Sequence, residues 1–105
     1  MKFVMVYIVT SHEEESALIG KKMVEERLAA CANIISSMKS LYWWKGKIEH
    51  DQESILILKT MEEKLDILIK RVKELHSYET PCIISCSILK GSEEYLNWIE
   101  GEVGA

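Results

Sequence analysis

The order in which strand-length apolar runs alternate with amphipathic segments limits this chain to few folds. The apolar runs occupy 3–9, 33–44, 47–59 and 82–89, and segments with apolar residues three and four apart lie at about 11–30 and 60–76. Only Lys45-Gly46 separates the second run from the third, which is typical of a hairpin. This order predicts a ferredoxin-like βαββαβ sandwich, in which one antiparallel sheet carries two helices on one face.

A short last helix after Gly91-Ser92 completes the predicted α+β fold. A chain of 105 residues that contains no linker, repeat or low-complexity tract predicts one domain over 1–105.

Capping residues and a proline indicate where the two longer helices begin and end. Ser11-His12-Glu13-Glu14 and Thr60-Met61-Glu62-Glu63 have the capping-box pattern, so we expect helices to begin there. The first is predicted to run to about Ala30, and the second to stop near His76 because Pro81 disfavours helical geometry before it. The apolar faces expected to contact the sheet are Ala17, Gly20, Val24, Leu28 and Cys31 in the first helix and Leu65, Leu68, Ile69, Val72 and Leu75 in the second.

Adjacent aromatic residues at the hairpin end predict an interface. Tyr42, Trp43 and Trp44 follow one another, and neighbouring residues of a strand point to opposite faces. One sheet face therefore cannot cover both Trp residues, and left in water they would form a large apolar patch. We predict that these three side chains lie in the interface of a homo-oligomer.

Charge and cysteine content exclude some functions. The net charge is −4 and the basic residues are interspersed with acidic ones, so nucleic acid is not an expected partner. No run approaches the roughly 20 apolar residues of a membrane-spanning helix. The run 3–9 is followed at once by Ser11-His12-Glu13-Glu14-Glu15, without a small-residue cleavage site, so we read a strand rather than a signal peptide and expect a cytoplasmic protein. Three cysteines, an odd number, suit a reducing compartment, and we expect Cys31, Cys82 and Cys86 to be buried apolar residues.

Catalytic patterns are not found. An acylphosphatase-like enzyme of this architecture would need an Arg before the first helix, but Thr10-Ser11-His12 has none, and both arginines, Arg27 and Arg71, fall in helices. Arg27 is interpreted as an ion-paired or interface residue. There is no Ser-His-Asp order, phosphate-binding Gly loop or nucleotide motif, and no stacking aromatics on the central strands for RNA. The sequence therefore predicts a protein that is not an enzyme.

Four segments resemble the CutA family, which is named for divalent-cation tolerance. They are 24–34 (VEERLAACANI), 42–49 (YWWKGKIE), 58–60 (LKT) and 75–81 (LHSYETP). The resemblance extends over nearly the whole chain. It implies a ferredoxin-like subunit in a homotrimer, with an architecture similar to the PII signal-transduction proteins, and a link to copper or other divalent metals.

The chain departs from the family pattern at several positions. Ser77 and Cys82 stand where the family usually has Pro and Glu. Some copper-linked members also carry a Cys at the end of the first strand and a second His before the Pro, where this chain has Val9 and Leu75. The resemblance therefore implies a copper site that lacks ligands here.

Two hypotheses for binding remain open. His76, Glu79 and Cys82 lie within seven positions and supply N, O and S donors, a mixed set that suits copper or zinc. The structural alternative is a His at a helix end, a solvated Glu and a core Cys. The other hypothesis is a PII-like regulatory trimer that binds a small ligand or protein in clefts between subunits, near Lys59, Tyr78 and Trp44.

Overall fold

The predicted order of elements is confirmed by the computed structural model, which describes residues 2–104. The elements are β1 (Phe3–Thr10), α1 (Glu13–Glu25), β2 (Cys31–Trp44), β3 (Lys47–Met61), the 3₁₀ turn η1 (Glu62–Lys64), α2 (Leu65–Leu75), β4 (Ile83–Ser87) and α3 (Glu93–Val103). The strands form one sheet in the order β2-β3-β1-β4, and all neighbours are antiparallel. This is the ferredoxin-like topology.

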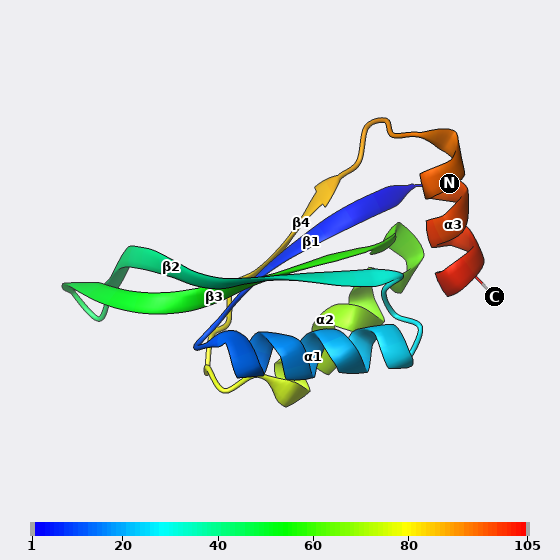
Figure 1. Cartoon of the computed structure of the whole chain (residues 1–105). Coiled ribbons are helices and arrows are strands. Elements are labelled where there is room, and N and C mark those ends of the chain that lie inside the picture. Colours follow the sequence, from blue (N-terminus) through cyan, green and yellow to red (C-terminus); the bar gives the residue numbers. More distant parts are fainter. Residues whose placement is uncertain (1, 105) are drawn as a thin grey trace.

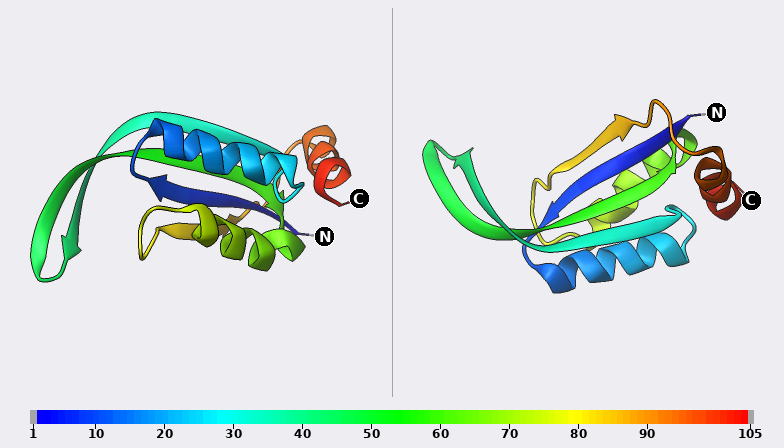
Figure 2. Two further views of the ribbon diagram at one scale, coloured as in Figure 1. Left: turned by 90° about the horizontal axis from the view of Figure 1, so that it is seen from below. Right: turned by 45° about the horizontal axis from the view of Figure 1, so that its top comes forward.

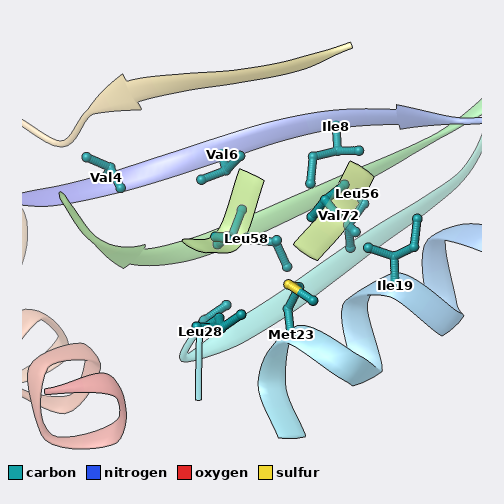
Figure 3. Close-up of a cluster of buried hydrophobic side chains, with 11 residues drawn as sticks. Val4, Val6, Ile8, Ile19, Met23, Leu28, Leu56, Leu58 and Val72 are labelled. Carbon is teal, nitrogen blue, oxygen red and sulfur yellow. The ribbon is translucent and has the colours of Figure 1, made fainter. Parts of the chain in front are cut away.

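The helices α1 and α2 lie side by side on one face of the sheet, and α3 packs at the end of the sheet (Figure 1; Figure 2). Alternate residues of β1 and β3 point toward the two helices and form the core (Figure 3). Its buried members are Val4, Val6, Ile8, Ile19, Met23, Leu28, Ala29, Leu56, Leu58, Leu68 and Val72. A smaller cluster of Ala30, Met61, Ile99 and Val103 holds α3 against the sheet.

The opposite face of the four-stranded sheet, here called the open face, is covered by neither α1 nor α2, and α3 packs only at one end of it, against Phe3 and Met61 (Figure 2). The strand registers place thirteen side chains on it: Phe3, Met5, Tyr7, Val9, Cys31, Asn33, Ile35, Ile55, Ile57, Lys59, Met61, Ile84 and Cys86. Met5, Ile35 and Ile84 are exposed. The single chain thus leaves an apolar sheet face in contact with water.

The β2-β3 hairpin extends well beyond the sheet as a two-stranded arm (Figure 1). β3 pairs with β1 only from Ser54 to Met61, so residues 38–44 and 47–53 pair only with each other. A register shift between Ile35 and Met38 marks the base of this arm. A two-stranded ribbon is marginally stable in water by itself. The arm therefore needs a surface to pack on.

The first helix differs from the prediction in its end and its face. α1 stops at Glu25 rather than Ala30, because Arg27 takes a φ of 60° and turns the chain, while the N–H groups of Leu28 and Ala29 both donate to the carbonyl of Met23. The buried face of the helix is Glu15, Ser16, Ile19, Gly20 and Met23. Of the predicted contacts, Gly20 and Leu28 are buried, Leu28 in the turn after the helix, whereas Ala17 and Val24 are exposed. His12, not Ser11, is the N-cap. The prediction followed apolar residues only, and it missed the true face because two of its members, Glu15 and Ser16, are polar.

Other boundaries also shift. α2 begins at Leu65 rather than Thr60, because Thr60 pairs with Val4 and continues β3. Its end at His76 and its predicted apolar stripe are confirmed. β2 begins at Cys31, which is therefore a strand residue. The expectation of buried cysteines is wrong in this chain, since Cys31 is half-buried and Cys82 and Cys86 are exposed.

Gly20 is the point of closest approach between α1 and the sheet. A Cβ there would lie 3.0 Å from Ala32 Cβ and 3.0 Å from a methyl of the buried Leu56. We expect Gly20→Ala to lower the free energy of unfolding by about 1 kcal/mol, because overpacking outweighs the gain in helix propensity. Gly101→Ala in α3, where a Cβ meets nothing within 4 Å, should raise stability. Denaturant unfolding at one protein concentration measures both, and equal effects would contradict the close approach.

Thr60 buries a hydroxyl that has no hydrogen-bond partner among the described residues. We expect Thr60→Val to stabilise the fold by about 1 kcal/mol, because Val keeps the shape and removes the desolvated hydroxyl. Thr10 is the matched control: it is equally buried, but its hydroxyl bonds to Ser16 Oγ at 2.6 Å and to the His12 carbonyl at 3.0 Å. Thr10→Val should destabilise. Thermal unfolding decides, and a loss in both variants would contradict the assignment.

Candidate functional site

The loop between α2 and β4 is built around His76, whose side chain is fully buried. Its Nε2 lies 2.7 Å from the carbonyl oxygen of Val9, and its Nδ1 accepts a hydrogen bond from the N–H of Tyr78 at 3.0 Å. Because Nδ1 accepts from a backbone N–H, Nε2 is the nitrogen that donates to the Val9 carbonyl. Both ring nitrogens are thus occupied by the backbone.

Glu15 connects this loop to the start of α1. Its buried carboxylate accepts from the N–H and hydroxyl of Ser11 at 2.9 and 2.8 Å and from the N–H of Ser77 at 2.7 Å. Burial by itself would raise the pKa of Glu15, but these hydrogen bonds lower it to about 2. The carboxylate is therefore ionised at neutral pH and ties residues 11 and 77 together.

The same loop reaches the base of the arm through Tyr78. Its hydroxyl donates to Glu53 Oε2 at 2.7 Å, and the side chain of Glu53 is buried on β3. Burial raises the pKa of Tyr78, and the bond to Glu53 raises it further. Two residues from Glu53 along β3, Asp51 accepts a hydrogen bond from the Tyr42 hydroxyl, which raises the pKa of Tyr42 to about 12. Two phenol–carboxylate pairs therefore brace the arm where it leaves the sheet.

The predicted metal ligands do not converge in the single chain. His76 has no free nitrogen, and Glu79 is exposed. Burial raises the pKa of the Cys82 thiol and the charge of Glu53 adds to this, whereas a metal ligand must be a thiolate. Within residues 2–104 no three His, Cys, Asp or Glu side chains group as a cation would require. These residues do not fit a copper or zinc ion within one subunit.

Titration of Cu²⁺ and Zn²⁺ tests the three residues directly. We expect wild type and a His76→Ala, Cys82→Ser double variant to bind either ion with equal affinity under reducing conditions, because both His76 nitrogens bond to the backbone and the exposed Cys82 is a single donor. The double variant should differ in stability, since His76 supports the loop. A clear loss of affinity in the double variant would restore these residues as ligands.

The three aromatic residues of the predicted interface lie on the arm, on two faces. Trp43 pairs with Ile48 and shares its face with Leu41, whereas Tyr42 and Trp44 lie on the other face. Trp43 is 71% exposed and Leu41 64% exposed. The expectation that adjacent aromatics point to opposite sides of a ribbon is confirmed, and the side chains are uncovered in the single chain.

The structure separates the residues predicted to line a ligand cleft. Tyr78 lies at the arm base, whereas Lys59 lies within the sheet, where it pairs with Met5 and Cys31, and reaches α3. The Lys59 ammonium donates to the Tyr95 hydroxyl at 3.4 Å. Sequence reasoning missed Glu15, Glu53 and Tyr95, because each acts through a partner distant along the chain.

The interpretation of Arg27 as an ion-paired residue is confirmed. Its guanidinium bonds to the side chain of Glu102 and, at 3.1 Å, to the Glu102 carbonyl. The pair links the turn after α1 to α3. Arg71 is likewise paired, with Glu26 at 2.9 Å.

Fold and site together define a ferredoxin-like α+β protein with a braced, projecting hairpin arm and an uncovered sheet face. The chain belongs to the CutA1 divalent ion tolerance protein family, whose family model matches residues 4–102. This confirms the resemblance drawn from the four sequence segments. Among the described residues, no helix has the length and apolar character needed to span a membrane.

Related proteins match over most of the chain. The divalent-cation tolerance protein CutA of Archaeoglobus fulgidus is 44% identical over 98 residues, which are 93% of this chain and 95% of that protein. The Thermus thermophilus CutA is 42% identical over 95% of this chain and 97% of its own length. The chloroplastic CutA 1 of rice is 38% identical over 92% of this chain, which spans only 55% of the rice protein.

Solved structures agree. The A. fulgidus CutA structure superimposes with a TM-score of 0.93 at 42% identity and covers 96% of this chain and 98% of that one. CutA1 of Oryza sativa gives a TM-score of 0.95 at 36% identity, with 98% and 94% covered. The fold is therefore that of the CutA structures.

The predicted cytoplasmic location is contradicted by the descriptions of related proteins. The A. fulgidus structure is described as a periplasmic protein and the rice relative as chloroplastic. The prediction rested on reading the N-terminal run as a strand rather than a signal peptide, and on an odd number of cysteines, all three of which are free thiols in the fold. Free thiols without a structural role do not identify a compartment.

Proposed function

We propose that this protein acts as a homotrimer in tolerance to divalent metal ions, with cation sites formed where subunits meet. The family name supports the role in tolerance. The arm is the observation that supports assembly: residues 38–53 form a two-stranded ribbon with Leu41, Trp43 and Ile48 exposed on one face. A second copy of the chain is the partner that would cover it.

Two further features favour assembly. The open face carries exposed Met5, Ile35 and Ile84, and burying apolar area of this kind is the main driving force for association. Both edges of the sheet, β2 and β4, also have an unpaired side. Head-to-tail association of two different surfaces closes into a ring, of which a trimer is one case.

The proposed cation sites draw ligands from more than one subunit, and this agrees with the finding that no three His, Cys, Asp or Glu side chains group as a cation would require within residues 2–104. Ligands pooled from neighbouring copies would supply the missing coordination. A cation held in this way binds the assembled protein only, so it also stabilises the assembly.

Sedimentation and native mass spectrometry with Cu²⁺ and Zn²⁺ test the proposal. We expect wild type to be trimeric at micromolar concentration and to bind cations in a constant ratio to trimers. A Leu41→Ser, Trp43→Ser variant should lose both assembly and tight binding. Leu18→Ser, at an exposed position of α1, is the matched control and should retain both. A wild type that stays monomeric, or a monomeric variant with unchanged affinity, would contradict the proposal.

A second candidate function is a regulatory trimer, similar to PII, that binds a small ligand between subunits and has no catalytic role. It is favoured by Lys59, a charged residue on a sheet face that assembly would cover. A screen of metal ions, nucleotides and small acids by native mass spectrometry separates the two candidates.

A further inference from the structure

Among the described residues that the strand registers place on the open face, Lys59 is the only one with a charged side chain. On this face its neighbours in the adjacent strands are Cys31 and Met5, and its neighbours along β3 are Ile57 and Met61. None of these carries a charge. The side chain is half-buried, and within residues 2–104 no carboxylate lies within 4.0 Å of the ammonium.

Hydrogen-bond donors gather around this ammonium. The Tyr95 hydroxyl accepts from Lys59 Nζ at 3.4 Å and lies 3.5 Å from the Cys31 thiol, while the ammonium is 5.5 Å from the centroid of the Tyr95 ring. The pKa of Tyr95 is raised, mainly by its hydrogen bond with Cys31. The side chains of Lys59, Tyr95 and Cys31, which all carry hydrogen-bond donors, therefore face one point of the open face.

An unpaired charge of this kind is incompatible with an apolar interface. Moving an ammonium out of water without a counter-charge is strongly unfavourable, and a phenol hydroxyl does not neutralise it. If a second copy covers the open face, an anion must accompany Lys59. The local groups supply donors and no acceptor carboxylate, so the complementary species is an oxyanion.

We propose that Lys59, with Tyr95 and Cys31, binds a small oxyanion, a carboxylate or a phosphate group, where the open face of one subunit is covered by the next. The inference rests on the proposed homotrimer and names the class of ligand that its subunit clefts take. Lys59 supplies the charge and Tyr95 a directed donor. The tilted pair of Tyr95 and Trp98 rings, 5.5 Å apart, forms one side of the site.

Isothermal titration with phosphate, sulfate and malonate tests the site, with sodium chloride at matched ionic strength as the control for screening. Phosphate and malonate together distinguish the two oxyanion classes. We expect heat of binding with at least one of them, and removal of the charge in Lys59→Met should weaken binding by about ten- to hundred-fold. Tyr95→Phe should weaken it less. Lys21→Met on α1 should leave it unchanged.

Sedimentation of the same samples keeps this inference separate from the proposed trimer. A wild-type trimer that binds no oxyanion, with Lys59→Met assembling less tightly, would mean that a carboxylate of the partner copy neutralises Lys59, and would overturn the site. Equal binding by wild type and Lys59→Met would also overturn it. A monomeric wild type would overturn the trimer, and oxyanion binding lost only in Lys59→Met would still support the site.

Discussion

Replacing Trp43 by alanine will weaken self-association by roughly hundred- to thousand-fold while leaving the fold of the single chain intact. Truncating a buried aromatic costs roughly 3 to 5 kcal/mol, and Trp43 becomes buried only when another copy covers the arm. In the single chain it is 71% exposed, so its removal takes little from the core. Trp44→Ala and Tyr42→Ala should act in the same direction.

Sedimentation equilibrium measures the dissociation constant, and circular dichroism of the separated subunits measures the fold. Lys21→Ala, an exposed change on α1, is the control and should leave association unchanged. An association constant that Trp43→Ala leaves within the range of this control would mean that the arm is not part of the interface.

Replacing Glu15 by glutamine will lower the free energy of unfolding at pH 7 by about 2 to 3 kcal/mol. The folded-state pKa of about 2 lies below the ordinary glutamate pKa of 4.5, so ionised Glu15 contributes stability above pH 4.5, and this contribution is lost as pH falls from 4.5 toward 2. A difference of this size corresponds to about 3 kcal/mol. Glutamine keeps the shape but cannot offer two charged acceptor oxygens to Ser11 and Ser77.

Denaturant unfolding of both proteins from pH 7 to pH 2, at one protein concentration, measures the effect. The stability curves should converge as the pH falls, because protonation removes from wild type what the substitution has already removed. Glu13→Gln in the same helical turn, at an exposed position, should follow wild type. Parallel curves for wild type and Glu15→Gln would exclude the proposed role of the carboxylate.

The fold was predictable because apolar runs dominate its elements. The four strands and two covering helices follow from runs such as 3–9 and from the 65–75 stripe, whose spacing matches a helix on a sheet. Prediction failed where polar residues are buried. Ser16 and Glu15 face the sheet through specific hydrogen bonds, and Thr60 fits a capping box as well as a strand.

The candidate site was less accessible to sequence reasoning. His76 was singled out for its donor atoms, but its environment depends on the Val9 carbonyl, 67 residues away, and such a partner cannot be found from local spacing. Tyr78 and Glu53 are 25 residues apart and meet only because the loop after α2 returns to the arm base. The arm aromatics were found because adjacent residues in a strand must diverge, which requires no tertiary information.

The position of β1 in the middle of the sheet has a consequence for the order of folding. Its partners lie between 44 positions away, for Thr10 and Ser54, and 83 positions away, for Val4 and Ser87, so neither edge of β1 can pair until distant segments meet. The β2-β3 hairpin is the one local pairing, closed by the turn between Trp44 and Lys47. Because closing short loops costs less entropy than closing long ones, we expect the hairpin to form early and the central strand to enter late. The segment that would meet another subunit is then present on the nascent chain before the sheet that carries it is complete.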